Sequence, residues 1–260
     1  MTRIETGPLA TARMASLLVA VTTGLLSSGL PAVAGDLPSV ETILERHEAA
    51  IGGDALGAVK NRSAKFEFEM PMQGLYTTGL DLWQRPGLHH TRIDLSSSGI
   101  ADFEGGVIDG VAWQVNPMLG TRRLSGDEER LALRGAHLSP FDEWQQLYAK
   151  AEVVGEQAVA DKQCYKVVFT PETGAALTSY FDQATGLLVR EEFPGPDGET
   201  LTVEFSDWAE TQGITQALQI KVTGSQGGWT TRFTDVEYDV DGIAADAFDL
   251  PASLVQAPAN

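Results

Sequence analysis

The stretch SYFDQATGLLVREEF, residues 179–193, has the pattern of a β-hairpin. Two short runs rich in aromatic and branched apolar residues flank the polar segment Asp182–Gly186, whose residue types favour a turn. The stretch contains neither histidine nor cysteine, and its polar tip contrasts with an apolar body. Two interpretations are open: the hairpin is plain scaffold, or it forms part of the wall of an apolar cavity.

Strand patterns continue on both sides of this hairpin. In residues 64–70, AKFEFEM, aromatic residues alternate with glutamates, as in a strand with one buried face. The pair Asp109-Gly110 between two further runs predicts a tight hairpin, because both residues tolerate positive φ. Along the chain, about eleven strands in two meanders have the spacing expected of a barrel or sandwich. No long linker divides them, so we expect a single domain.

Three segments have helical patterns. Residues 39–53 begin with a serine as candidate N-cap, end in two glycines and carry an apolar stripe that includes His47. Ser125 precedes Glu128 by three residues, which predicts a capping box. Residues 139–151, SPFDEWQQLYAKA, start with serine and proline and contain an aromatic stripe, which predicts a further helix. We expect helices on the concave face of the sheet and His47 in the core.

The N-terminal segment resembles a secretory signal peptide. Two arginines precede an apolar run, and Ala32-Val33-Ala34 provides a cleavage site. We therefore predict a signal peptide over residues 1–34, cleavage near Ala34 and export of a single domain, residues 35–260. An uncleaved membrane anchor is the alternative. The single cysteine, Cys164, allows no internal disulfide, and its place in a strand predicts a buried, inert thiol.

The charge balance limits the kinds of macromolecule that this protein can bind. The chain has 36 acidic and 18 basic residues and a formal net charge of −18. Such a surface repels nucleic acid and anionic lipid headgroups. It favours a soluble protein, and we expect a monomer that binds no nucleic acid. A basic protein partner at the cell envelope is the one macromolecule that this charge would attract.

The sequence lacks a recognisable catalytic or metal motif. His89 and His90 are neighbours in a predicted strand, so they should point to opposite faces and not bind one metal ion. We therefore predict no metal, no cofactor and no catalytic residues. The enzyme alternative is a hydrolase that uses a carboxylate on the apolar face. Asp235 and Glu237 are its candidates, because they share the alternation of Phe233.

The informative signal is apolar. Large hydrophobic residues recur on what alternation predicts to be one face of the sheet and on the mid-chain helices. If the helices do not fill the concave face, the space that remains suits acyl chains. We expect seven residues to line such a lipid-binding cavity: Phe66, Phe68, Leu80, Leu82, Trp113, Trp144 and Leu147.

Short motifs resemble those of a known family. Tyr180-Phe181-Asp182 turns through Thr185-Gly186-Leu187, and the chain closes on Phe248-x-Leu250-Pro251. In these features the chain resembles the outer-membrane lipoprotein-sorting protein superfamily, with its LolA/LolB-like fold, and above all the superfamily's uncharacterised periplasmic members. The resemblance implies an α+β, mainly antiparallel β protein: an incomplete, half-open barrel with helices as a lid. It also makes the hairpin a cavity wall, with Leu187 and Val189 facing inward.

The sequence and the resemblance together predict a function. We expect a periplasmic binding or carrier protein that holds a lipid, or the acyl chain of a lipoprotein, in an apolar cavity without covalent chemistry. Its partner would be the lipid or the acylated lipoprotein. The alternative is a periplasmic protein-interaction or sensor module on the same fold, with an acidic docking surface.

Overall fold

The computed structural model describes residues 37–195, 198–225 and 227–255. These described residues belong to one compact unit. The predicted signal peptide, residues 1–34, lies outside the described residues and stays a prediction.

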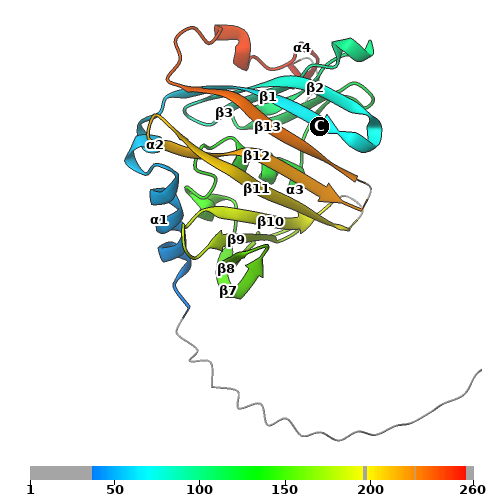
Figure 1. Cartoon of the computed structure of the whole chain (residues 1–260). Helices are drawn as coiled ribbons and strands as arrows, with labels where there is room; N and C mark the ends of the chain where they lie inside the picture. The colour runs from blue at the N-terminus through cyan, green and yellow to red at the C-terminus, as the bar shows by residue number, and fades with distance from the viewer. Residues whose placement is uncertain (1–36, 196–197, 226, 256–260) are drawn as a thin grey trace, which may run out of the picture. The chain divides into compact units, whose positions relative to one another are not determined.

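One antiparallel sheet forms most of this unit (Figure 1). In the described residues it has thirteen strands in the order β6-β5-β4-β3-β2-β1-β13-β12-β11-β10-β9-β8-β7. The edge strands β6 and β7 do not pair with each other, so the barrel is open. The predicted α+β, mainly antiparallel half-open barrel is confirmed, with more strands than the expected eleven or so. The strands are β1 Asn61–Met70, β2 Leu75–Gln84, β3 Leu88–Ile93, β4 Phe103–Ile108, β5 Val111–Asn116, β6 Gly120–Arg123, β7 Lys150–Val159, β8 Lys162–Thr170, β9 Leu177–Asp182, β10 Leu188–Pro194, β11 Thr200–Thr211, β12 Ile214–Gly224 and β13 Gly227–Tyr238.

The described residues form four α-helices, of which the first matches its prediction. They are α1 Val40–Ile51, α2 Asp54–Ala58, α3 Asp127–Gly135 and α4 Ala252–Val255. Ser39 is the N-cap of α1, and its Oγ accepts a hydrogen bond from the backbone N–H of Thr42 at 3.2 Å. The cap of α3 was predicted wrongly: it is Gly126, not Ser125, and no side chain caps this helix.

The prediction of a helix over residues 139–151 is also wrong. The segment forms turns and one short 3₁₀ helix, η3 (Trp144–Gln146), and β7 already begins at Lys150. Glu143 has φ of 53°, which an α-helix cannot accommodate. The physical reason is tertiary packing: Phe141 and Tyr148 are buried against the sheet from a turn rather than from one helix face.

The two faces of the sheet follow from the strand register. Residues directly opposite each other in an antiparallel pair point to the same side. The inner face carries Phe66 and Phe169. Three segments cover it, namely α1, α3 and residues 136–149, and together they are here called the cover. Figure 1 shows α3 behind the front strands and α1 beside them.

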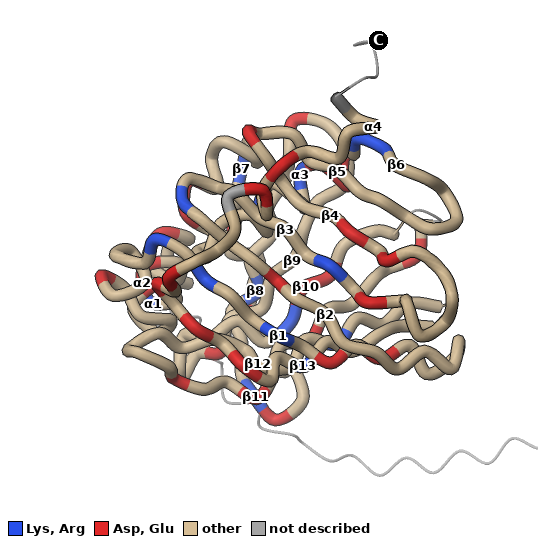
Figure 2. The backbone as a smooth tube through the Cα atoms, turned by 90° about the horizontal axis from the view of Figure 1, so that it is seen from above, with Lys and Arg blue, Asp and Glu red and all other residues tan. Residues whose placement is uncertain are grey.

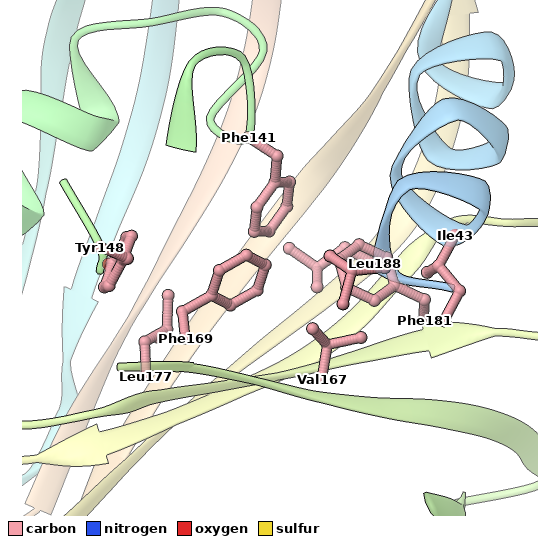
Figure 3. Packing of buried hydrophobic residues seen from close by; sticks show 9 residues of the cluster. Ile43, Phe141, Tyr148, Val167, Phe169, Leu177, Phe181 and Leu188 are labelled. Atoms are coloured by element: carbon pink, nitrogen blue, oxygen red, sulfur yellow. The ribbon is translucent and has the colours of Figure 1, made fainter. Parts of the chain in front are cut away.

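The cover packs tightly over β8, β9 and β10 (Figure 3). Phe141 stacks on Phe169 with ring centroids 5.3 Å apart and meets Phe181 edge-on at 5.2 Å. Ile43 of α1 and Leu188 of β10 close the same cluster. Burial of such aromatic side chains supplies much of the stability of this half of the sheet.

The outer face of β2, β4 and β5 is also covered. Residues 240–255, here called the C-terminal segment, follow β13 and contain α4 and the 3₁₀ helix η4 (Ala245–Phe248). Phe248 and Leu254 of this segment form a buried cluster with Leu82, Ile108 and Trp113. These strands are therefore buried on both faces.

The hairpin of residues 179–193 is present as β9 and β10. Gly186 in its turn has φ of 78°, and a Cβ there would lie 3.0 Å from the backbone oxygen of Arg46, so the turn requires glycine. Leu188 packs inward against Phe181, whereas Val189 packs outward with Tyr180. The inward prediction for Val189 is wrong because the register shifts between Leu188 and Arg190.

Candidate functional site

A cavity lies between the inner face of the sheet and the cover. It consists of two adjoining hollows of about 240 Å³ and 280 Å³. Both are lined by Arg62, Asp81, His89, Leu138 and Phe205, so we treat them as one site, the inner cavity. Strands from distant parts of the sheet meet the cover here.

The walls of the inner cavity are largely apolar. Leu188 of β10, Phe205 of β11, Ile220 of β12 and Phe233 of β13 contribute from the sheet. Leu138 contributes from the cover. Apolar walls of this kind favour an apolar ligand.

A charged cluster occupies the end of the cavity at β1, β2 and β3. Asp81 is buried, forms an ion pair with Arg62 and lies 2.8 Å from Nε2 of His89. The hydroxyl of Thr91 donates a further hydrogen bond to Asp81. Burial alone would raise the pKa of Asp81, but the charges of His89 and Arg62 and these hydrogen bonds outweigh it. The pKa of Asp81 therefore lies well below its usual range.

A second buried ion pair joins the cover to the sheet. Arg134 at the end of α3 donates from both terminal nitrogens to the two carboxylate oxygens of Glu191, each at 2.6 Å. Ser179 also donates to Glu191, at 3.1 Å. Burial acts to lower the pKa of Arg134, but the carboxylate of Glu191 outweighs it and the pKa is raised. Arg134 therefore stays charged.

Four residues that line the inner cavity each carry a buried polar atom without a hydrogen-bond partner within the described residues. These atoms are Nε of Arg62, Nε of Arg134, the indole Nε1 of Trp208 and Nε2 of Gln216. The other end of the Gln216 amide is held, because its Oε1 accepts from the hydroxyl of Tyr238 at 2.7 Å. Buried polar groups are normally paired, so four unpaired ones among the residues around one cavity are unusual.

A second hollow, of about 450 Å³, lies on the outer face beneath the C-terminal segment. Leu80, Leu82, His90 and Arg92 line it. Nδ1 of His90 donates to the backbone oxygen of Ala247 at 2.8 Å, so this hollow is held together by its own contacts. None of its described lining atoms is a buried polar group without a partner. The inner cavity is therefore the candidate functional site.

The structure does not bring the seven predicted lining residues together. Leu80, Leu82 and Trp113 lie on the outer face, in or against the cluster beneath the C-terminal segment. Trp144 and Leu147 pack on the core cluster around Phe169. Their predicted role in lipid binding stays a prediction, but they do not share one cavity.

The two phenylalanines of β1 do lie on the inner face. The ring of Phe66 meets that of Phe233, a wall residue of the inner cavity, with centroids 6.0 Å apart. Phe68 is buried on the same face, two residues further along β1. Neither lines the inner cavity directly.

The charged cluster was not found from the sequence. In Leu80-Asp81-Leu82 the alternation favours the leucines as the inner residues, yet Asp81 faces inward and the leucines outward. The error arises because the C-terminal segment covers the outer face. A signal was present in the adjacent histidines: His89 and His90 do point to opposite faces, as predicted, and His89 meets Asp81.

The carboxylates named for the enzyme alternative do not reach the inner cavity. A bulge in the pairing of β1 with β13 places Phe233 opposite Phe66 and Asp235 opposite Lys65. Asp235 therefore lies on the outer face, with its side chain 2.9 Å from Lys65 Nζ. Glu237 lines the outer hollow. The predicted common face with Phe233 is wrong, because the bulge inverts the alternation.

Two further observations concern the described residues alone. No cluster of three or more histidine, cysteine, aspartate or glutamate side chains in this part of the chain is arranged to hold a metal ion. No helix there has the length and apolarity needed to cross a membrane.

Comparison with known proteins defines the class of fold. A LolA superfamily protein from Nitrosomonas europaea is similar over 82% of this chain and 98% of its own, with a TM-score of 0.57 and 13% identity. A DUF1329 family protein from Desulfovibrio piger is similar over 84% of this chain and 99% of its own, with a TM-score of 0.55 and 17% identity. The chain thus has a LolA-like fold.

A further structure is similar at a lower score. A putative outer membrane lipoprotein-sorting protein domain from Vibrio parahaemolyticus has a TM-score of 0.48 and 14% identity, over 79% of this chain and 94% of its own. No protein-family model matches the sequence, and no curated protein matches it.

Proposed function

We propose that this protein is a periplasmic binding or carrier protein that holds the acyl chain of a lipid or lipoprotein in its inner cavity. The observation that carries the proposal is the cavity with apolar walls between the open sheet and a cover made of separate segments. The LolA-like fold supports it. In this proposal residues 1–34 direct export and residues 35–260 form the binding domain.

The binding energy would come from burial of the chain. Each methylene group removed from water contributes about 0.8 kcal/mol, so about ten of them provide roughly 8 kcal/mol before the cost of association. No covalent step is needed. The protein would work as a monomer, because one cavity lies within one chain.

Native mass spectrometry of the protein purified from a Gram-negative periplasm tests the proposal. We expect a bound lipid or acylated peptide at close to one per chain, which solvent extraction then identifies. A mass of the bare chain that does not change when phospholipid, fatty acid or acylated peptide is added would contradict it. Salt-sensitive capture of a basic protein would then favour the interaction-module alternative.

Two matched variants locate the bound chain. Ile220 is half-buried and projects from the middle of the inner face, so Ile220→Trp should fill the inner cavity and reduce binding at least tenfold. Leu82 lines the outer hollow, so Leu82→Ala should leave binding unchanged although it costs about 2–5 kcal/mol of stability. The opposite pattern would place the bound acyl chain in the hollow on the outer face.

A further inference from the structure

We propose that one end of the sheet docks on the surface of a zwitterionic phospholipid bilayer. This end consists of residues 70–77, 95–101, 115–121, 222–225 and 227–231, here called the rim. The inference concerns a different part of the molecule from the inner cavity and goes beyond the proposed function.

The strand order brings four connections of the chain together at the rim. The turn from β1 to β2 lies beside the start of β13, because Glu69 of β1 pairs with Thr230 of β13 (Figure 1). The connections from β3 to β4 and from β5 to β6 follow at the same end, because neighbouring strands of this sheet are antiparallel. Strands lie about 4.8 Å apart, so the rim extends over about 30 Å from β6 to β12.

Exposed apolar side chains gather on the rim. Among the described residues eight large hydrophobic side chains are exposed, and six of these belong to the rim. Met118, Leu119 and Met72 are exposed to 92%, 73% and 74%. The others are Tyr76, Ile100 and Trp229. Single exposed apolar residues are normal on a protein surface, but their concentration at one end indicates an interaction site.

The rim is also uncharged. Its segments contain no Asp, Glu, Lys, Arg or His, although 21% of the whole chain is Asp, Glu, Lys or Arg. The nearest acidic neighbour, Glu199, marks its border and accepts a hydrogen bond from the backbone N–H of Ser225 at 2.5 Å. With a net charge of −18, the chain as a whole is repelled by anionic groups. The rim is an end that can enter the headgroup region without desolvating a charge.

The spacing and type of the exposed side chains favour a bilayer over a protein partner. They project from four separate connections and not from one continuous face. A protein would need a matching series of pockets, whereas a fluid bilayer admits each side chain wherever it lies. Trp229 and Tyr76 each combine an apolar ring with a polar N–H or O–H, which suits the boundary between headgroups and acyl chains.

The rim adjoins the inner face of the sheet. Trp229 precedes Phe233, a wall residue of the inner cavity, by four residues in β13, and alternation places both on the same face. Four residues of a strand span about 13 Å. A docked bilayer would therefore lie close to the site of the proposed acyl chain.

Flotation of the protein with vesicles of dioleoylphosphatidylcholine measures docking. Met118→Glu and Met72→Glu each place a charge on the rim at an exposed side chain, so each should lower the partition coefficient at least tenfold while the circular dichroism stays native. The matched control is Val154→Glu, because Val154 is an exposed apolar residue of β7, outside the rim. It should bind within twofold of the unmodified protein. All variants carry the same N-terminal segment, so the contribution of that segment cancels.

Three results would overturn the inference. The first is equal binding by Met118→Glu and Val154→Glu. The second is absence of vesicle binding by the unmodified protein; if Met118→Glu then dissociates a dimer in sedimentation, a second copy of the chain covers the rim instead. The third is tighter binding when phosphatidylglycerol replaces part of the phosphatidylcholine, because basic side chains would then make the contact.

A cavity variant separates this inference from the proposed function. Ile220→Trp fills the inner cavity but leaves the rim intact, so it should lose the bound acyl chain and still float with vesicles. If Ile220→Trp loses vesicle binding and Met118→Glu retains it, the cavity itself holds the vesicle lipid. That result overturns docking by the rim and leaves the proposed function in place.

Discussion

His47 shows how burial alone changes the chemistry of a residue. Its ring lies between Phe141 and Phe181, with centroids 5.5 Å and 5.3 Å away. Nδ1 lies 3.0 Å from the backbone oxygen of Gly186, and since a carbonyl only accepts, Nδ1 carries the hydrogen. Burial lowers the pKa of His47 to about 4, although the contact with Gly186 and the charge of Glu191 act in the opposite direction. The neutral ring is the folded form at neutral pH.

This pKa predicts a specific loss of stability in acid. The unfolded chain binds a proton at His47 below its ordinary pKa of 6.5, and the folded chain does so only near 4. The free energy of unfolding should therefore fall as pH drops from about 6.5 to about 4, by up to roughly 3 kcal/mol. Urea unfolding at pH 7 and pH 4.5 measures it. In His47→Asn, which keeps a donor for Gly186, the free energy of unfolding should fall clearly less between pH 7 and pH 4.5. An equal fall in both proteins would refute the assignment of the acid loss to His47.

At the scale of elements, close contacts between strands depend on single glycines. Gly79 of β2 lies directly opposite Phe66 of β1. A Cβ on Gly79 would lie 2.1 Å from the Phe66 ring and 2.5 Å from the backbone oxygen of Arg92, so both neighbouring strands would have to move. The glycine lets Phe66 lie flat across β2 and support Phe233 behind the inner cavity.

A pair of glycine-to-alanine substitutions tests this contact. Gly79→Ala should lower the free energy of unfolding by about 1–3 kcal/mol or more, because it overpacks a buried contact. Gly57→Ala is the matched control: Gly57 lies in α2 with open space around it, so alanine should be neutral or stabilise by up to about 1 kcal/mol. Thermal unfolding followed by circular dichroism measures both. Equal midpoints for the two variants would show that the sheet relaxes freely at Gly79.

The sequence patterns predicted some elements correctly and others wrongly, and the difference has a physical cause. Helix α1 and the hairpin of β9 and β10 were predicted from capping residues and turn chemistry, which act over a few residues. The bulges in β10 and β13 were not, and each inverted the faces of the residues beyond it. The faces of Val189 and Asp235 were predicted wrongly for this one reason. A bulge inserts one extra residue, which shifts the two-residue period of the strand, and the sequence pattern does not reveal the insertion.

At the scale of the whole molecule, β1 joins the two meanders. It pairs with β2 on one side and with β13, from the end of the chain, on the other. Acidic residues are spread along this sheet and its loops, among fewer basic ones (Figure 2). With a net charge of −18, repulsion between them opposes the compact state.

This charge predicts that salt stabilises the protein. Raising NaCl from about 10 mM to about 150 mM shortens the Debye length from roughly 30 Å to 8 Å, which screens the repulsion. The melting temperature should rise by a few degrees. Choline chloride at equal ionic strength should have the same effect if screening is the cause. A melting temperature that stays constant or falls would mean that attractive ion pairs, such as Arg122 with Glu128, dominate instead.

The sequence by itself determined the fold class, the first helix, the hairpin turns and the opposite directions of His89 and His90. These depend on local geometry: the two-residue period of a strand, the cap of a helix and the turn residues. Only the tertiary structure decided which side of each strand is the inside. Alternation defines two faces but does not say what covers them, and here the C-terminal segment buries Leu82 and Trp113 on the outer face. Asp81 was left to face the inner cavity, where Arg62 and His89 provide the partners that make its burial possible.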